Sequence, residues 1–168
     1  MSAEVQKAVN YGNWVSTRII LAPTIFAVVC FALAFLSLYL LIPAGMLSLT
    51  AGYFIYARYL FSSKGGNVQE RLHSLVLESL AWDGKGKALD IGCGSAALTI
   101  DLALKFPLSS VVGTDYWGGS WEYSQKVCQT NACLKHVEGR VTFQKASASS
   151  LPFSDGQFDA VVGILKTW

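Results

Sequence analysis

The chain has 168 residues, of which 52% are hydrophobic and only 14% are charged, and its formal net charge is +2. This composition is too apolar for an ordinary soluble domain, and the charge is too small and scattered to predict a nucleic-acid-binding surface. The four cysteines lack the Cys-x-x-Cys spacing of a zinc or redox site, so we expect reduced thiols and no metal.

The apolar residues are concentrated in the first third of the chain. Residues 1–18 form a short polar lead, and from Ile19 through Ala57 the sequence contains no Asp, Glu, Lys, Arg or His. A continuous helix of that length would reach about 58 Å, almost twice the ~30 Å hydrocarbon core of a bilayer. Pro43-Ala44-Gly45 is expected to break it. The pattern therefore predicts a transmembrane helical hairpin over residues 19–60.

The two predicted crossings cover residues 19–42 and 46–60. Pro23 would lie in the first turn of the first crossing, where its missing N–H costs little. The second crossing is short and carries small residues that could let it pack against the first, namely Ser48, Thr50 and Gly52.

The flanking charges predict the orientation of this hairpin. Lys7 and Arg18 precede it, Arg58 and Lys64 follow it, and the central turn has no charge. By the positive-inside rule, both ends and the following domain lie in the cytoplasm, which predicts a multi-pass membrane protein with the lipid bilayer as a partner. A buried hairpin in a soluble protein is an alternative. A cleaved signal peptide fits less well, because its apolar core has only 7–15 residues.

A linker is predicted over residues 61–67, followed by a helix over residues 68–82. Asn67 can cap that helix, and Asp83-Gly84-Lys85-Gly86 ends it. Its apolar face is expected to contain Leu72, Leu75, Val76, Ser79 and Leu80.

The stretch from Lys87 to Ile100 carries the main functional signal. A short apolar strand ends at Asp90 and breaks into Gly92-Cys93-Gly94, and a helix with apolar residues at spacings of three and four then runs to Phe106. Because Gly92 and Gly94 have no side chain and tolerate positive φ, the backbone can approach a small ligand closely.

Two kinds of ligand fit this turn by spacing. Gly92-x-Gly94-x-x-Ala97 also matches the dinucleotide fingerprint, with Asp115 about 20 residues further on. That fingerprint places a pyrophosphate at the turn, where Asp90 would repel it. Asp90 suits a ligand with an ammonium group, such as S-adenosylmethionine.

Three segments then resemble a known family in order and spacing. Leu89–Gly94 resembles the first motif of the class I S-adenosylmethionine-dependent methyltransferases, Val111–Asp115 resembles their second strand, and Leu151–Phe153 with Phe158–Val162 resembles the approach to strand four. The resemblance covers roughly the second half of the chain. It implies a Rossmann-like α/β fold, S-adenosylmethionine as cofactor and a partial methyltransferase domain over residues 68–168.

The resemblance also implies which residues hold the cofactor. Asp115, at the end of the strand over residues 109–115, would accept the ribose hydroxyls, although it could instead be a turn residue that caps the next helix. Tyr116 and Trp117 could cover the adenosine or belong to the core. Ser147 stands where relatives carry an Asp for the adenine, before Ala148. The predicted set is Asp90, Gly92, Cys93, Gly94, Asp115, Tyr116, Ser147 and Ala148.

The remaining elements are a helix over residues 120–134 and strands over residues 140–145 and 158–164. Ala96 replaces the third glycine of the first motif, which we expect to be a mild change. The family has seven strands, and this chain ends at Trp168 after the fourth. We therefore expect a truncated sheet in the order 3-2-1-4 with an exposed fourth strand.

These patterns predict a membrane-anchored methyltransferase acting on a small-molecule or lipid acceptor, with no residue assigned as catalytic. The missing strands and Ser147 leave open a non-catalytic cofactor-binding or membrane-interaction protein. An NAD-type dinucleotide-binding module fits the glycine spacing but not Asp90 or the strand-four segment.

Overall fold

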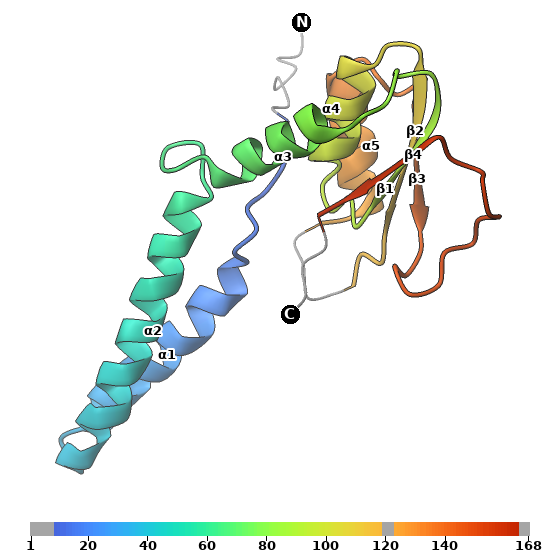
Figure 1. The fold of residues 1–168 in the computed structure, drawn as a ribbon. Coiled ribbons are helices and arrows are strands. Elements are labelled where there is room, and N and C mark those ends of the chain that lie inside the picture. The colour runs from blue at the N-terminus through green and yellow to red at the C-terminus, as the bar shows by residue number, and fades with distance from the viewer. Residues whose placement is uncertain (1–8, 119–122, 165–168) are drawn as a thin grey trace, which may run out of the picture. The chain divides into compact units, whose positions relative to one another are not determined.

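A computed structural model of the chain describes residues 9–118 and 123–164 (Figure 1). The chain folds into two units, which are described separately. One is Asn13–Leu72, and the other contains the described residues up to Gly12 and those from His73 onward. The elements in chain order are α1 (Thr17–Leu33), η1 (Leu38–Leu40), α2 (Leu41–Leu60), α3 (Val68–Ser79), β1 (Gly86–Ile91), α4 (Ala97–Lys105), β2 (Ser109–Asp115), α5 (Gln125–Leu134), β3 (Val141–Lys145) and β4 (Ala160–Gly163).

The second unit is built on a four-stranded parallel sheet in the order β3-β2-β1-β4, which confirms the predicted order. The register places Ala88 of β1 beside Val111 of β2 and Ala160 of β4. All three of these side chains are buried. The central strands are apolar because the sheet is parallel and each crossover helix returns over it.

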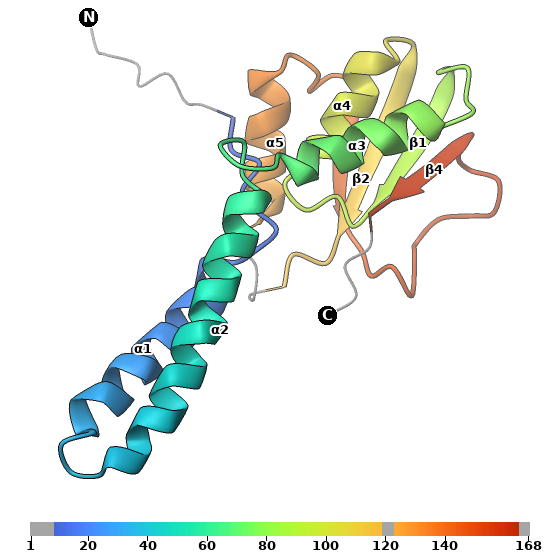
Figure 2. The same cartoon turned by 60° about the vertical axis from the view of Figure 1, so that its left-hand side comes forward.

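Helices α4 and α5 lie on the same side of this sheet (Figures 1 and 2). The core of this unit contains Ile100 and Leu102 of α4 and Cys128 of α5, and all three side chains are fully buried. On the opposite side of the sheet Val161 is 55% exposed, and the described part of the chain places no helix there. Among the described strands β4 lies at the edge of the sheet and pairs with β1 alone, as predicted.

Helix α5 begins later than predicted. Residues 119–122 are outside the described part of the chain, and the helix starts at Gln125 because Ser124 caps it. The Ser124 hydroxyl accepts a hydrogen bond from the Val127 N–H at 3.3 Å, which fixes the helix start.

Helix α3 starts at Val68 as predicted but ends at Ser79 rather than Trp82. Its buried face also differs, because Gln69 and His73 are buried whereas Leu75 is exposed. His73 Nδ1 lies 3.9 Å from an Asp101 carboxylate oxygen, which pairs this buried histidine with an acid of α4.

The other unit is an antiparallel helical hairpin whose turn is not where the sequence analysis placed it. The chain leaves the helical path at residues 34–37, and Pro43 lies inside the first turn of α2, where its missing N–H is tolerated. Conversely, Pro23 lies inside α1, because that helix already begins at Thr17, capped by Ser16. The predicted break at Pro43-Ala44-Gly45 is therefore wrong.

Alanines, rather than the predicted Ser48, Thr50 and Gly52, form the contact between α1 and α2. The buried residues of the hairpin helices and turn are Ala27, Ala34, Ala44 and Ala51, and no atom lies within 4 Å of a Cβ built on Gly52. The alanines are seven residues apart on each helix, which keeps them on one face. Small side chains at this spacing allow close helix packing. Small residues thus form the contact, as predicted, but they are alanines and not the three residues named from the sequence.

The outer surface of the hairpin is apolar all round. Phe26, Phe35, Tyr39 and Leu49 are each more than 60% exposed. Ser48 and Thr50 donate their hydroxyl hydrogens to carbonyls four residues earlier, so these polar groups are satisfied within the helix. By length and composition, one helix, Leu38–Leu60 with mean hydropathy 1.7, could cross a membrane in the part of the chain described here. Thr17–Leu33 is apolar but shorter.

The base of the hairpin is closed by polar and aromatic contacts. The Asn13 side-chain amide donates to the Arg58 carbonyl at 3.0 Å, and the Arg58 guanidinium donates to the Val15 carbonyl. The rings of Trp14 and Phe61 are 5.5 Å apart. The two ends of the apolar hairpin thus leave it from the same place.

Candidate cofactor site

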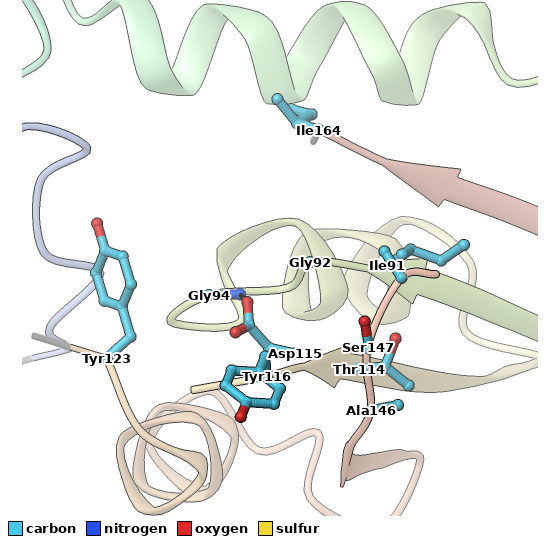
Figure 3. Close-up of a pocket in the computed structure, with 11 residues that line it drawn as sticks. Ile91, Gly92, Gly94, Thr114, Asp115, Tyr116, Tyr123, Ala146, Ser147 and Ile164 are labelled. Carbon is cyan, nitrogen blue, oxygen red and sulfur yellow. Dashed lines mark hydrogen bonds between the residues drawn. The ribbon is translucent and has the colours of Figure 1, made fainter. Parts of the chain in front are cut away.

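A cavity of about 220 Å³ opens at the carboxyl ends of β1 and β2 (Figure 3). Six of the predicted site residues line it, and these are Gly92, Gly94, Asp115, Tyr116, Ser147 and Ala148. The sequence analysis missed Ile91, Thr114, Tyr123, Ala146 and Ile164. The carboxyl ends of parallel strands are the usual place for a ligand in an open α/β sheet.

The glycine turn is fixed by backbone hydrogen bonds to the neighbouring strand. The N–H groups of Gly92 and Cys93 both donate to the Thr114 carbonyl, at 2.7 and 2.9 Å. Gly92 and Gly94 have φ values of 76° and 56°, which only residues without a Cβ adopt freely. Ala96, which follows the turn, has φ of 70°, so the replacement of the third glycine requires a strained conformation and is not the mild change expected.

Asp115 is the carboxylate that lines the cavity among its described residues. One of its oxygens accepts the Gly94 N–H at 2.9 Å and the other accepts the Trp117 N–H at 2.8 Å. Figure 3 shows the carboxylate directed toward Gly94. Because a carboxylate offers about four lone-pair positions, two remain for the hydroxyls of a ribose. Asp115 therefore acts both as a turn residue and as a cavity acceptor.

Three groups hold the Gly94 peptide. Its N–H is bound by Asp115, and its carbonyl accepts the Trp117 indole N–H at 2.9 Å and the Cys128 thiol at 3.1 Å. Trp117 packs against the core and does not line the cavity, so of its two interpretations the core one is correct. No local sequence pattern indicates that Cys128 would reach this turn.

Asp90 does not line the cavity, which corrects its predicted role. Its side chain is 1% exposed and accepts the Thr99 hydroxyl at 2.6 Å, behind the glycine turn. Burial, opposed by the Thr99 hydrogen bond and reinforced by the charge of Asp115, raises the pKa of Asp90 to about 7. Asp90 therefore does not contact a ligand ammonium group in the cavity directly.

Cys93 is also directed away from the cavity. It is 7% exposed and lies beside Cys128, and both thiols are free. A hydrogen bond with Cys128, and then burial, raises the pKa of Cys93, so it packs as a neutral thiol rather than serving as a ligand-binding group.

The buried Asp90 predicts a pH-dependent stability. The unfolded chain releases this proton near pH 3.8, whereas the folded chain holds it to about pH 7. The stabilisation from the folded protonated form is therefore complete below pH 3.8 and is lost as the pH rises to about 7. Asp90→Asn should remove that loss, which we expect to be about 2 kcal/mol between pH 5 and pH 7 in urea unfolding of the full chain in detergent.

The matched control for this measurement is Asp155→Asn, which changes an exposed carboxylate in a turn. It should retain the wild-type pH dependence. If the free energy of unfolding depends on pH equally in the wild type and in Asp90→Asn, the folded chain does not hold a proton on Asp90.

The other ligand that fits the spacing, a pyrophosphate, is disfavoured at the glycine turn. The Gly94 N–H is already bound by Asp115, whose charge would oppose a second anion. Ala96, Ala97 and Leu98, at the start of α4, are buried, so the helix N-terminus is not open to a phosphate.

Comparisons with known proteins agree with the cavity's chemistry. Residues 88–167 match the family model described as "Methyltransferase domain". A ubiquinone/menaquinone biosynthesis C-methyltransferase from Citrifermentans bemidjiense is 30% identical over 95 residues, which are 55% of this chain and 38% of that protein. Cycloartenol-C-24-methyltransferase 1 from Oryza sativa is 34% identical over 60% of this chain and 28% of its own length. The chain thus spans well under half of these relatives.

Among solved structures, a geranyl diphosphate methyltransferase in complex with S-adenosylmethionine has the same fold, with a TM-score of 0.52 and 16% identity. The match covers 64% of this chain and 41% of that one. Residues 88–167 thus match a methyltransferase domain in sequence, and the described sheet agrees with that fold. S-adenosylmethionine is the methyl donor that such a domain implies.

The residues present fit this donor. Asp115 retains acceptor positions for ribose hydroxyls, and the bare backbone at Gly92 leaves room beside them. Tyr116 lines the cavity with a ring that is 64% exposed. The Ser147 hydroxyl and the Tyr123 ring lie on opposite sides of the cavity (Figure 3). When bound, the donor supplies an electrophilic methyl group.

Proposed function

We propose that this chain is a membrane-anchored S-adenosylmethionine-dependent methyltransferase that acts on an apolar, lipid-borne acceptor. The observation that carries the proposal is the combination of a donor cavity around Asp115 with a hairpin whose exterior is apolar on every face. A pair of helices that buries only alanines leaves too much apolar surface for water, and a bilayer would cover it.

The charge distribution supports the proposed orientation. Arg18 and Arg58 lie at the base of the hairpin, and the turn at residues 34–37 carries no charge. By the positive-inside rule this distribution favours the cytoplasmic side for the base and for the methyltransferase domain that follows it. Tyr56, Tyr59 and Trp14 near the same end suit the aromatic belt of a membrane interface.

The relatives' names support an apolar acceptor. They are enzymes of ubiquinone or menaquinone biosynthesis and of cycloartenol methylation at carbon. We propose that the acceptor of this chain is likewise an apolar molecule that reaches the domain from the bilayer. Methyl transfer is an in-line displacement, so the protein's main contribution would be to align donor and acceptor.

The test uses the full chain in lipid nanodiscs. Titration calorimetry should detect binding of S-adenosylhomocysteine and none of NAD. Incubation with methyl-labelled S-adenosylmethionine and a total lipid extract should then place label in the organic phase above the level of Asp115→Asn. Binding without any label in lipid would favour the alternative of a non-catalytic cofactor-binding protein, and heat with NAD alone would favour a dinucleotide-binding module.

A further inference from the structure

Residues 10–12, here called the amino-terminal strap, lie against the glycine turn although the sequence analysis treated them as part of a polar lead. The side chain of Asn131 in α5 forms hydrogen bonds with both backbone groups of Asn10. Its side-chain oxygen accepts the Asn10 N–H at 3.0 Å, and its amide nitrogen donates to the Asn10 carbonyl at 2.8 Å. The same nitrogen donates to the Ser95 carbonyl at 3.0 Å. Asn131 is 1% exposed, so these bonds form away from water.

A second hydrogen bond connects the strap to the turn directly. The Ser95 hydroxyl donates to the Tyr11 carbonyl at 2.6 Å, and Ser95 immediately follows Gly94. The Tyr11 ring packs against the hydrophobic core, and its hydroxyl is buried with no hydrogen-bond partner. Burial, and then the charge of Asp101, raises the pKa of this hydroxyl to about 12, so Tyr11 remains neutral. The strap is thus held at two successive residues.

The strap reaches the donor cavity through Tyr123. Gly12 has φ of 65°, and a Cβ built on it would lie 2.6 Å from the Tyr123 ring. The same ring lies 3.7 Å from a Cβ built on Gly94, and Tyr123 lines the cavity. Figure 3 shows this ring on the opposite side of Asp115 from Ser147. Tyr123 therefore stands between the strap and the glycine turn.

We propose that Asn131 is a positioning residue of the methyl-donor site, which seats the amino-terminal strap so that the strap holds Tyr123 at the glycine turn. Asn131 does not itself line the cavity. Its carboxamide satisfies both backbone groups of Asn10 at once, which neither a carboxylate nor an apolar side chain of the same size can do. The inference rests on the proposed donor binding and adds the residues that close one side of the site.

Two variants of the full chain in nanodiscs test this inference. Asn131→Ala removes the seat of the strap, and Gly12→Ala displaces Tyr123 while leaving Asn131 intact, because the new methyl group collides with the ring. We expect each to weaken S-adenosylhomocysteine binding about tenfold in calorimetry. Gly139→Ala is the matched control, since no atom lies within 4 Å of a Cβ there, and it should bind as the wild type does.

Hydrogen exchange separates positioning from general stability. In the wild type, S-adenosylhomocysteine should slow amide exchange in the peptide that contains the strap, and this ligand-dependent protection should be lost in both variants. A wild-type chain that binds no S-adenosylhomocysteine overturns the proposed function itself. Wild-type binding together with unchanged affinity and strap protection in Gly12→Ala overturns this inference alone, even if Asn131→Ala fails to fold.

Discussion

Asp115→Asn is expected to weaken S-adenosylhomocysteine binding by about 100-fold. The carboxylate accepts the Gly94 and Trp117 N–H groups with its two oxygens, and an amide would turn a donor toward one of them. The variant also loses the charge that strengthens hydrogen bonds from ribose hydroxyls. Loss of one such bond, at about 1.5–3 kcal/mol, corresponds to roughly ten- to 150-fold in affinity. Calorimetry with the full chain in nanodiscs measures it.

The control for this variant is again Asp155→Asn, which removes the same charge from an exposed turn outside the cavity. It should bind S-adenosylhomocysteine with wild-type affinity. If Asp115→Asn binds as tightly as this control, the cavity around Asp115 is not the donor site.

The second large effect concerns the hairpin. Phe26 and Leu49 lie near the middles of α1 and α2 and are 62% and 78% exposed. The double variant Phe26→Lys/Leu49→Lys places two charges on the apolar exterior, and each costs about 2.5–3.5 kcal/mol at the centre of a membrane helix. In a sucrose gradient we expect the wild-type chain to float with liposomes. The double variant should instead remain at the bottom of the gradient.

Leu104→Lys/Leu108→Lys is the matched control, because it adds the same two charges at exposed leucines of the methyltransferase unit. This variant should still float. Flotation of the Phe26→Lys/Leu49→Lys chain to the wild-type extent would mean that the hairpin exterior is covered by something other than lipid.

The strand order and the glycine turn could be predicted from sequence because their signals are local. A short apolar run, a turn of glycines and a helical pattern specify one strand-turn-helix unit, and Asp115 follows at the expected distance. The direction of Asp90 could not be predicted in this way. Whether a carboxylate at the end of a strand faces the ligand or the helix behind depends on its rotamer and on Thr99, nine residues further on.

The hairpin turn is not where the helix-breaking residues predict it, because the packing of α1 against α2 decides its position. Residues 34–37 include neither Pro nor Gly, whereas Pro43 is accommodated within the first turn of α2. Which alanines become buried between the two helices is set by their packing, and the sequence alone does not distinguish Ala27 and Ala51 from the other alanines of the hairpin.

The amino-terminal strap had no sequence signal at all. Asn10 and Asn131 are 121 residues apart, and a single asparagine on a helix is no more suggestive than any other polar residue. Tyr123 was missed for the same reason, because the closeness of its ring to Gly12 joins distant segments of the chain. Contacts of this kind follow from the three-dimensional fold and not from any periodicity.

The distance along the chain between the strap and its seat also orders events during synthesis. At about 5–20 residues per second, Asn131 leaves the ribosome on the order of ten seconds after Asn10. The whole apolar hairpin is translated within that interval. The hairpin, if it inserts into a membrane as proposed, would be available for insertion before the cavity near Gly94 can be completed, so a nascent chain would not yet bind a methyl donor tightly.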